Sequence, residues 1–317
     1  MDPITTNKVT GTQVIAVAGA IAYDLIATTD TYFGETPVLN CKLNTLSETF
    51  GGCAGNIAYS LAQLACQPLL LSCSGQQDQS RYLEHLRGAG ITTDFNLSIS
   101  GAACARASVI TDPQGQQFTA FYPGPVPTVE RWQAHLNQLD KQHVSVFVQA
   151  PYPTELMMCA LQYFSRRASI LKIWAPGQYA DQLAPQEVEI LLSMTDWLIG
   201  NSHEINILRN RSDLNNHNII TTNGDQPVRV DQPGQPPATF PVMPVARQLD
   251  PTGCGDALTA GIASALANKA AINSAIELGI ACAAACLGEE GAQYHRLNAE
   301  RDDQGGPLRL IPERKNP

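Results

Sequence analysis

The segment DPTGCGDALTAG, residues 250–261, combines a run of small residues with a carboxylate, Asp256, that could take part in catalysis. The apolar pattern that begins at Ala257 predicts a helix whose start falls within residues 252–255. The N–H groups of residues 253–256 would then converge at a helix N-terminus, where small side chains leave room for a phosphate. The Asp256 carboxylate would repel that phosphate, but it could take a proton from an attacking hydroxyl.

The spacing leaves two interpretations of Asp256 about even. In one, Asp256 is the general base of a kinase that acts on an alcohol, while Gly253, Cys254 and Gly255 stabilise charge on the transferred group. In the other, Asp256 only complements the helix dipole, as acids at helix starts often do.

A second polar and glycine-rich segment reads FGGCAGNIAYSLAQLA, residues 50–65. Gly51, Gly52 and Gly55 allow close approach to the backbone, and Asn56 offers both a donor and an acceptor. These groups suit a polyhydroxylated ligand. A tight turn that leads into a helix, with Asn56 near its start, is the alternative.

Short apolar runs alternate with helical patterns along the chain and predict the elements that position these residues. Examples are VIAVAGAI, NIAYSLAQLA, PLLLSCSG and SRYLEHLRGAGI. This rhythm predicts an α/β fold with a mostly parallel sheet, and ligands at the carboxyl ends of its strands. Residues from about 28 to 50 and from about 98 to 125 look like strands of a small β lid. The chain, 1–317, shows no linker and is expected to form a single domain.

Composition excludes several classes of function. The formal charge of −9 and the lack of a basic cluster argue against a nucleic-acid partner. No apolar window is long enough to span a bilayer, so no membrane partner is expected. Nine scattered cysteines suit a reducing, cytoplasmic location, and the pair Cys282 and Cys286 lacks further ligands for a metal.

The usual nucleotide-binding motifs are missing. The chain has no GxxxxGK[ST], which disfavours a P-loop enzyme, and no complete GxGxxG, which disfavours a nicotinamide dehydrogenase.

Three segments in this order, GGCAGN, GNSHEINIL and DPTGCGDALTAG, resemble the PfkB (ribokinase-like) family of carbohydrate and nucleoside kinases. The resemblance spans nearly the whole chain. GGCAGNIAY, TAFYPG and the proline of DPTGCGDA look most like bacterial adenosine kinases. The resemblance implies a three-layer α/β/α fold with a small β lid. It also implies ATP-dependent phosphoryl transfer to the 5′-hydroxyl of a nucleoside, with adenosine and AMP as the expected pair.

The resemblance also implies roles for residues of the substrate site. Asp256 matches the family base and residues 253–255 its anion hole. Asp24, in GAIAYDLI, matches the acid that accepts ribose hydroxyls, and Gly51, Gly52 and Asn56 would complete the substrate contacts. Without the resemblance, a surface turn is the better interpretation of Asp24.

Two aromatic residues of the expected lid could stack on adenine. Phe121 is the first choice and Phe118 the second, for which a place in the core is at least as good. They lie three apart and would not share a face of a regular strand.

For ATP and Mg²⁺ the resemblance points to a separate group of residues. Asn201 and Glu204 match the pair that organises Mg²⁺ and the phosphates, with Glu204 acting through water. An ordinary turn-to-helix pair is the alternative. Thr222 and Gly224 match part of the TxGxxG loop that binds ATP. A monovalent cation is left open.

Two departures from the family pattern bear on activity. Pro227 replaces the last glycine of TxGxxG, and Ala175 stands where relatives carry an acid. We expect an active but slower enzyme. A kinase for ribose or another sugar, and a nucleoside- or nucleotide-binding protein with impaired turnover, remain alternatives.

Two further expectations concern thiols and assembly. A helix N-terminus should lower the pKa of Cys254, and Cys53 lies in the substrate glycine segment, so alkylation of either should inhibit. An exposed edge strand of the lid could pair between subunits, which leaves a homodimer open.

Overall fold

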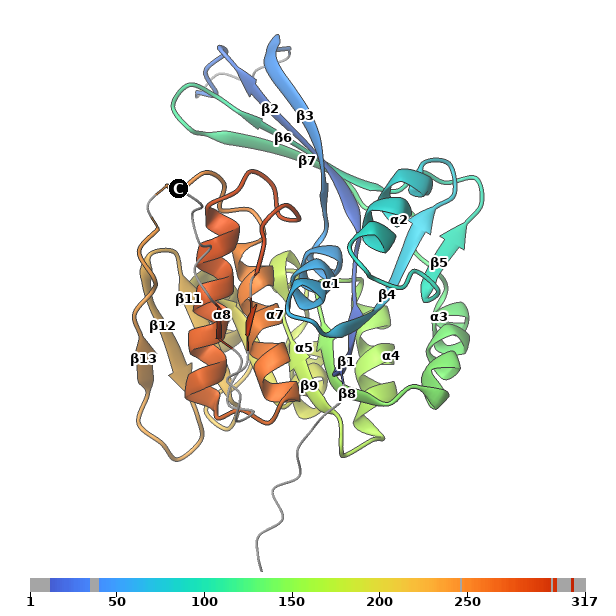
Figure 1. Ribbon diagram of the computed structural model, residues 1–317, viewed down its shortest axis with the longest axis vertical. Coiled ribbons are helices and arrows are strands. Elements are labelled where there is room, and N and C mark those ends of the chain that lie inside the picture. The colour runs from blue at the N-terminus through green and yellow to red at the C-terminus, as the bar shows by residue number, and fades with distance from the viewer. Residues whose placement is uncertain (1–11, 35–39, 246, 298, 301–308, 311–317) are drawn as a thin grey trace, which may run out of the picture.

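A nine-stranded sheet forms the centre of the computed structural model, which describes residues 12–34, 40–245, 247–297, 299–300 and 309–310 (Figure 1). Its strand order is β13-β12-β11-β10-β9-β8-β1-β4-β5, and every neighbouring pair from β11 to β5 is parallel. The strands are β1 (Val14–Ala18), β4 (Gln67–Gly75), β5 (Asn96–Ile99), β8 (Val144–Gln149), β9 (Leu171–Trp174), β10 (Trp197–Asn201), β11 (Ile219–Asn223), β12 (Gln226–Asp231) and β13 (Ala238–Phe240).

Helices cover both faces of this sheet, because its central strands are apolar on both sides. Ile15 and Val17 of β1 pack into one buried cluster, while Ala16 and Ala18 pack into the other. The first cluster includes α1 (Cys53–Gln63), α2 (Gln79–Gly88), α7 (Cys254–Ala267) and α8 (Ile272–Leu287). The second includes α3 (Val129–Leu136), α4 (Thr154–Ser165), α5 (Pro185–Ser193) and α6 (Ser202–Arg209). The predicted three-layer α/β/α fold is confirmed.

A separate four-stranded sheet projects beyond the carboxyl ends of the central strands (Figure 1). Its order is β3-β2-β6-β7, formed by β2 (Ala22–Thr29), β3 (Leu43–Gly51), β6 (Ala105–Thr111) and β7 (Gln117–Tyr122). The expected lid boundaries differ from these strands at two places. The sheet already includes residue 22, and residues 96–99 pair with β4 in the central sheet instead. Residues 35–39 of the expected lid lie outside the described residues.

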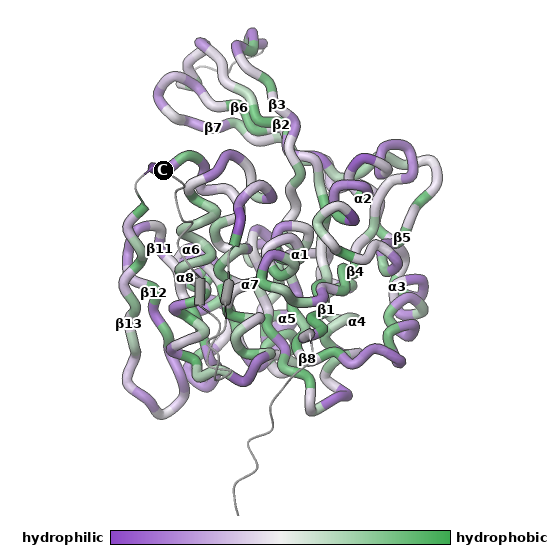
Figure 2. The backbone as a smooth tube through the Cα atoms, viewed as in Figure 1, coloured by the Kyte–Doolittle hydropathy of each residue, from purple (hydrophilic) through white to green (hydrophobic). Residues whose placement is uncertain are grey.

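Four short elements complete the described fold. They are two 3-10 helices, η1 (Asn137–Lys141) and η2 (Gly177–Tyr179), and the pair of short strands β14 (Ala299–Glu300) and β15 (Arg309–Leu310). The most hydrophobic residues lie inside the three layers, whereas hydrophilic residues lie at the surface (Figure 2). Among the helices of the described ranges, none combines the length and apolar character that crossing a bilayer requires.

Candidate active site

The N-terminus of α7 is built around Gly253. This residue has φ +80°, and a Cβ here would collide with the side chain of Ala292. Asp250 fixes the preceding loop, because its carboxylate accepts from the N–H of Thr252 (2.9 Å) and of Gly291 (3.1 Å). The glycine is therefore required both by backbone conformation and by close packing.

The backbone donors at this helix start differ in part from the expectation. The N–H of Cys254 already donates to the carbonyl of Pro251 at 3.2 Å. Within the described residues, the N–H groups of Gly255 and Asp256 have no protein acceptor, and nothing lies within 4 Å of a Cβ placed on Gly255. An anion can reach these two donors, while Cys254 contributes little through its backbone.

Asp256 lies in the first turn of α7 and is half-buried. Its Oδ2 accepts from Nδ2 of Asn56 at 2.8 Å, and the Cys53 thiol donates to it as well. Burial raises the pKa of Asp256 to about 7, helped by the carboxylates of Glu204 and Asp24 and opposed by the two hydrogen bonds. A carboxyl group with this pKa can accept a proton near neutral pH.

Asp24 lies in β2 at the root of the four-stranded sheet. Burial, together with the charge of Asp250, raises its pKa to about 6. A Cβ on Gly51 would collide with the Asp24 carboxylate, so Gly51 leaves room for that side chain. Gly52 has φ +82°, and a Cβ there would lie 2.7 Å from the backbone of residues 20–22. Both glycines are thus explained by packing within the chain.

Asn56 is buried and hydrogen-bonded on both sides of its amide. Nδ2 donates to Asp256, and Oδ1 accepts from Nε2 of Gln293 at 2.9 Å. Sequence analysis did not single out Gln293, because its segment carries no motif. Its contact with Asn56 joins residues that are far apart in the chain.

Asn201 and Glu204 form a capping box at the start of α6. The N–H of Glu204 donates to Oδ1 of Asn201 (2.9 Å), and the Glu204 carboxylate accepts from the N–H (3.0 Å) and Nδ2 (2.7 Å) of Asn201. The pair thus caps the turn into α6, while its role toward Mg²⁺ stays a prediction. Burial raises the pKa of Glu204, which also lies near enough to raise that of Asp256.

The donor set suits a magnesium ion that keeps most of its water. Among the described residues, no group of three or more His, Cys, Asp or Glu side chains could by itself hold a metal. Mg²⁺ in nucleotide sites commonly takes one or two carboxylates and relies on phosphates and water for the rest. Glu204 offers such a carboxylate.

Thr222 and Gly224 lie at the carboxyl end of β11. Thr222 pairs with Asn201 in the sheet register, which brings these two predicted residues together. Gly224 has φ +58° in the turn between β11 and β12. Pro227 falls where the register of that hairpin shifts, a position that tolerates a residue without an N–H.

Ala175 directly follows β9 at the carboxyl edge of the central sheet. Its N–H donates to the carbonyl of Gln149 at 2.8 Å. The methyl side chain supplies no charge at this edge, so Glu204 and Asp256 carry the acidic character of the neighbouring strand and helix ends.

The register of the four-stranded sheet separates Phe121 from Phe118. Asp24 pairs with Ala107, and Ala107 pairs with Phe121, so Phe121 shares a face with Asp24. Phe118 pairs with Ile110, which pairs with Ala27, on the opposite face. Both rings are about half exposed. The prediction that the two rings do not share a face is confirmed, whereas a place in the core is wrong for Phe118, whose ring is exposed. Stacking of either ring on a base stays a prediction.

The pKa values of the Cys254 and Cys53 thiols are shifted in opposite directions. The pKa of Cys254 is lowered, chiefly by a hydrogen bond with the thiol of Cys286, against the opposing effect of burial. Burial raises the pKa of Cys53 well above its usual range, and nearby Asp256 adds to this. The predicted direction for Cys254 is confirmed with a different main cause, and Cys53 is not expected to be nucleophilic.

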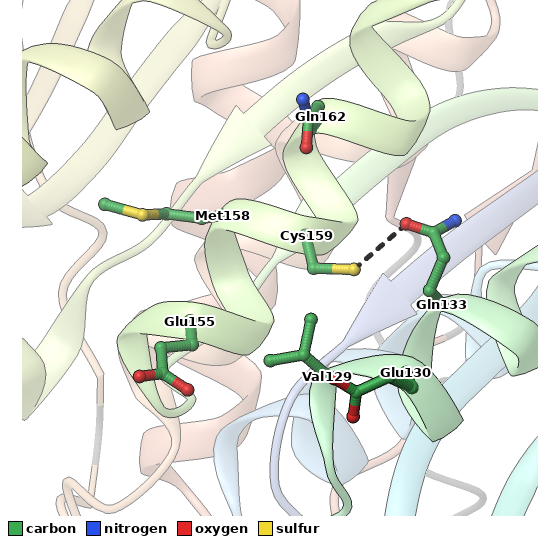
Figure 3. Close-up of a pocket in the computed structure, with 7 residues that line it drawn as sticks. All are labelled: Val129, Glu130, Gln133, Glu155, Met158, Cys159 and Gln162. Atoms are coloured by element: carbon green, nitrogen blue, oxygen red, sulfur yellow. Dashed lines mark hydrogen bonds between the residues drawn. The ribbon is translucent and has the colours of Figure 1, made fainter.

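A shallow groove between α3 and α4 contains none of these residues (Figure 3). Cys159 donates across it to Oε1 of Gln133 at 3.2 Å. Glu130 and Glu155 line it, and no basic side chain does. This acidic lining does not suit a phosphorylated ligand.

Comparison with known proteins gives relatives of similar length. A nucleoside kinase of Methanothermobacter thermautotrophicus is 23% identical over 297 residues, covering 88% of this chain and 91% of that protein. A ribokinase of Bacillus subtilis is 26% identical over 291 residues, covering 88% and 94%.

A solved structure shares the fold. The nucleoside kinase of Burkholderia thailandensis in complex with inosine superposes with a TM-score of 0.79 at 22% identity, covering 89% of this chain and 93% of that one. The predicted ribokinase-like fold is thereby confirmed. The sequence profile described as pfkB family carbohydrate kinase matches residues 12–299. The chain therefore belongs to the pfkB family of carbohydrate kinases.

Proposed function

We propose that this protein transfers the γ-phosphoryl group of ATP to the 5′-hydroxyl of a nucleoside, most simply adenosine to give AMP. One observation carries the proposal: Asp256, with its pKa raised to about 7, adjoins the two N–H groups at the start of α7 that have no protein acceptor among the described residues. A base and an anion-binding group thus stand together, as phosphoryl transfer to an alcohol requires.

The chain's own residues divide the work. Asp256 takes the proton of the attacking hydroxyl. The N–H groups of Gly255 and Asp256 stabilise negative charge on the transferred group, and the α7 dipole adds to this. Asp24 accepts hydrogen bonds from ribose hydroxyls, and Asn56 fixes the Asp256 carboxylate from the buried side.

The nucleotide and its ion would be held at the neighbouring strand ends. Thr222 and Gly224 border the place for ATP beside Asn201, and Glu204 would contact Mg²⁺ through water. The ion supplies charge neutralisation for the phosphates. A requirement for a monovalent cation stays a prediction.

Phe121 supports a nucleoside over a free sugar. Its ring shares the face of Asp24 and is about half exposed, so a purine could stack against it when the four-stranded sheet closes over the site. Among the relatives, two are named nucleoside kinases in the comparisons above, which agrees with this choice.

A sugar kinase is the second candidate, because a ribokinase is also among the relatives. Impaired turnover is supported by Ala175, which supplies no carboxylate after β9, and by Pro227 in the loop expected to bind ATP. A homodimer through the edge strands β3 or β7 stays a prediction, as does a cytoplasmic location.

The test is ADP formation from ATP and Mg²⁺ with adenosine, inosine, other nucleosides and ribose in parallel. We expect turnover with a nucleoside that rises with pH through about 7, as Asp256 loses its proton. Asp256→Asn should lower kcat by about 10²–10⁴-fold, because it removes the base. Turnover with ribose alone would sink the nucleoside assignment, and binding without turnover would favour an impaired protein.

A further inference from the structure

A chain of buried hydrogen bonds runs from the glycine segment of β3 to Asp256. The Tyr82 hydroxyl donates to the carbonyl of Gly51 at 2.5 Å, and Nε2 of Gln293 donates to that hydroxyl at 2.6 Å. The same Nε2 donates to Oδ1 of Asn56, whose Nδ2 donates to Asp256. The network connects β3, α1, α2, α7 and the segment after α8.

The carbonyl of Gly51 fixes the donor and acceptor of every hydrogen bond in this network. A backbone carbonyl can only accept, so the Tyr82 hydroxyl donates its one hydrogen to Gly51. The same hydroxyl can then only accept a hydrogen bond from Gln293. Gln293 must therefore present Nε2, whose second hydrogen goes to Asn56. As a result, Asn56 turns Oδ1 toward Gln293 and Nδ2 toward Asp256.

The surroundings of Gln293 hold its amide in this orientation. The side chain is buried, and its Oε1 lies 3.0 Å from Nε2 of His85, which must carry a hydrogen there. Burial lowers the pKa of His85, so this imidazole is neutral near pH 7. A Cβ on Gly55 would collide with the Tyr82 hydroxyl and lie 3.0 Å from Nε2 of Gln293. The glycine at position 55 thus leaves room for the network.

We propose that Gln293 is a positioning residue for phosphoryl transfer, which holds the Asn56 amide so that Nδ2, and not Oδ1, faces the Asp256 carboxylate. This inference rests on the proposed function of Asp256 as the base. An amide N–H favours the ionised carboxylate, whereas a carbonyl oxygen in the same place favours the protonated one. The orientation set by Gln293 therefore keeps Asp256 able to accept a proton.

Other groups also shift the pKa of Asp256, and a variant that tests Gln293 must leave them in place. Asp256 is faced by the Cys53 thiol from α1, by Glu204 from α6 and by Asp24 from β2. None of these contacts Gln293 in the described structure, so a substitution at Gln293 reaches Asp256 through Asn56.

The experiment compares wild-type protein with Gln293→Met, a side chain of similar length without the amide. We expect the acidic limb of the kcat profile to move to higher pH by about one unit, so that kcat falls about tenfold at pH 6 and recovers to within about twofold at pH 9. KM for ATP should not change. A uniform loss of rate at every pH would overturn the positioning role and leave Gln293 a merely structural residue.

Two further variants keep the test decisive. Phe164→Leu, in the cluster on the other face of the sheet, should lower stability without moving the pH profile. Tyr82→Phe removes the hydroxyl that sets the bond direction and should move the limb the same way by a smaller amount. If Gln293→Met does not fold, an unmoved limb in Tyr82→Phe overturns the proposal.

A readout without turnover separates this inference from the proposed function. The side-chain carboxyl carbon of Asp256, observed by NMR in ¹³C-aspartate-labelled protein and assigned with Asp256→Asn, should titrate at higher pH in Gln293→Met than in wild type. Equal midpoints would contradict the inference. A shifted midpoint in a protein that phosphorylates none of the substrates would retain the effect of Gln293 on Asp256, but it would reject the proposed function and with it the role in phosphoryl transfer.

Discussion

At the scale of single residues, the site is a set of acids whose pKa values are raised by burial. The pKa of Asp256 is raised to about 7, that of Asp24 to about 6, and that of Glu204 in the same direction. The charges of Glu204 and Asp24 make ionisation of Asp256 more costly, and hydrogen bonds from Asn56 and Cys53 offset this. A bound magnesium ion would relieve the same repulsion.

The thiols give a prediction at this scale. Iodoacetamide should alkylate Cys254 faster than Cys53, because the pKa of Cys254 is lowered and that of Cys53 is raised by burial. ATP should slow the reaction at Cys254. Peptide mass spectrometry over a time course measures both rates, and preferential labelling of Cys53 would contradict the assignment.

At the scale of elements, α7 and α8 approach unusually closely where two glycines face each other. A Cβ on Gly261 would lie 2.7 Å from Cα of Gly279, and a Cβ on Gly279 would lie 2.8 Å from the carbonyl of Leu258. The same packing places the N-terminus of α7 against the segment that carries Ala292 and Gln293. The helix pair thus supports the N-terminal end of α7.

Gly279→Ala should therefore lower the free energy of unfolding by about 1–3 kcal/mol, because the added methyl group meets backbone and the side chain of Ile262. Urea unfolding measures the change. Gly88→Ala is the matched control, since nothing lies within 4 Å of its Cβ, and it should be neutral or stabilise by up to about 1 kcal/mol. Similar effects of the two substitutions would show that the helix contact does not limit stability.

At the scale of the whole molecule, the four-stranded sheet is anchored at one end to the three-layer body. The Tyr23 hydroxyl donates to the carbonyl of Asp78 (2.8 Å), whose carboxylate accepts from Arg106 (3.0 Å) and from the N–H of Cys104 (2.7 Å). The strands beyond this anchor project over the carboxyl edge of the central sheet (Figure 1). One face of the projecting sheet carries both Asp24 and Phe121.

Substitutions on the two faces test whether that sheet covers the substrate. Phe121→Ala should raise KM for the nucleoside about tenfold, because it removes a stacking surface on the face of Asp24. Phe118→Ala removes an equally exposed ring from the opposite face and should change KM by less than about twofold. Steady-state kinetics with the nucleoside varied at saturating ATP measures both, and equal effects would contradict the assignment of faces.

The sequence by itself determined the alternation of strands and helices and the position of Asp256 at a helix start. Apolar runs are local patterns, so they predicted the parallel sheet, the helices on both faces and the start of α7 just before Asp256. The turn-to-helix interpretation of Asn201 and Glu204 also depends only on neighbours in the chain, which is why it could be predicted.

Only the tertiary structure decided which groups are free to act. The three-residue spacing already predicted opposite faces for Phe121 and Phe118, but only the strand register put Phe121 on the face of Asp24. The loop before α7 engages the N–H of Cys254, whereas those of Gly255 and Asp256 have no protein acceptor within the described residues. The contact between Asn56 and Gln293 joins segments remote in the chain, where no periodic pattern operates. Such pairings follow from how whole layers pack, and the raised pKa of Asp256 follows in turn from the burial that this packing creates.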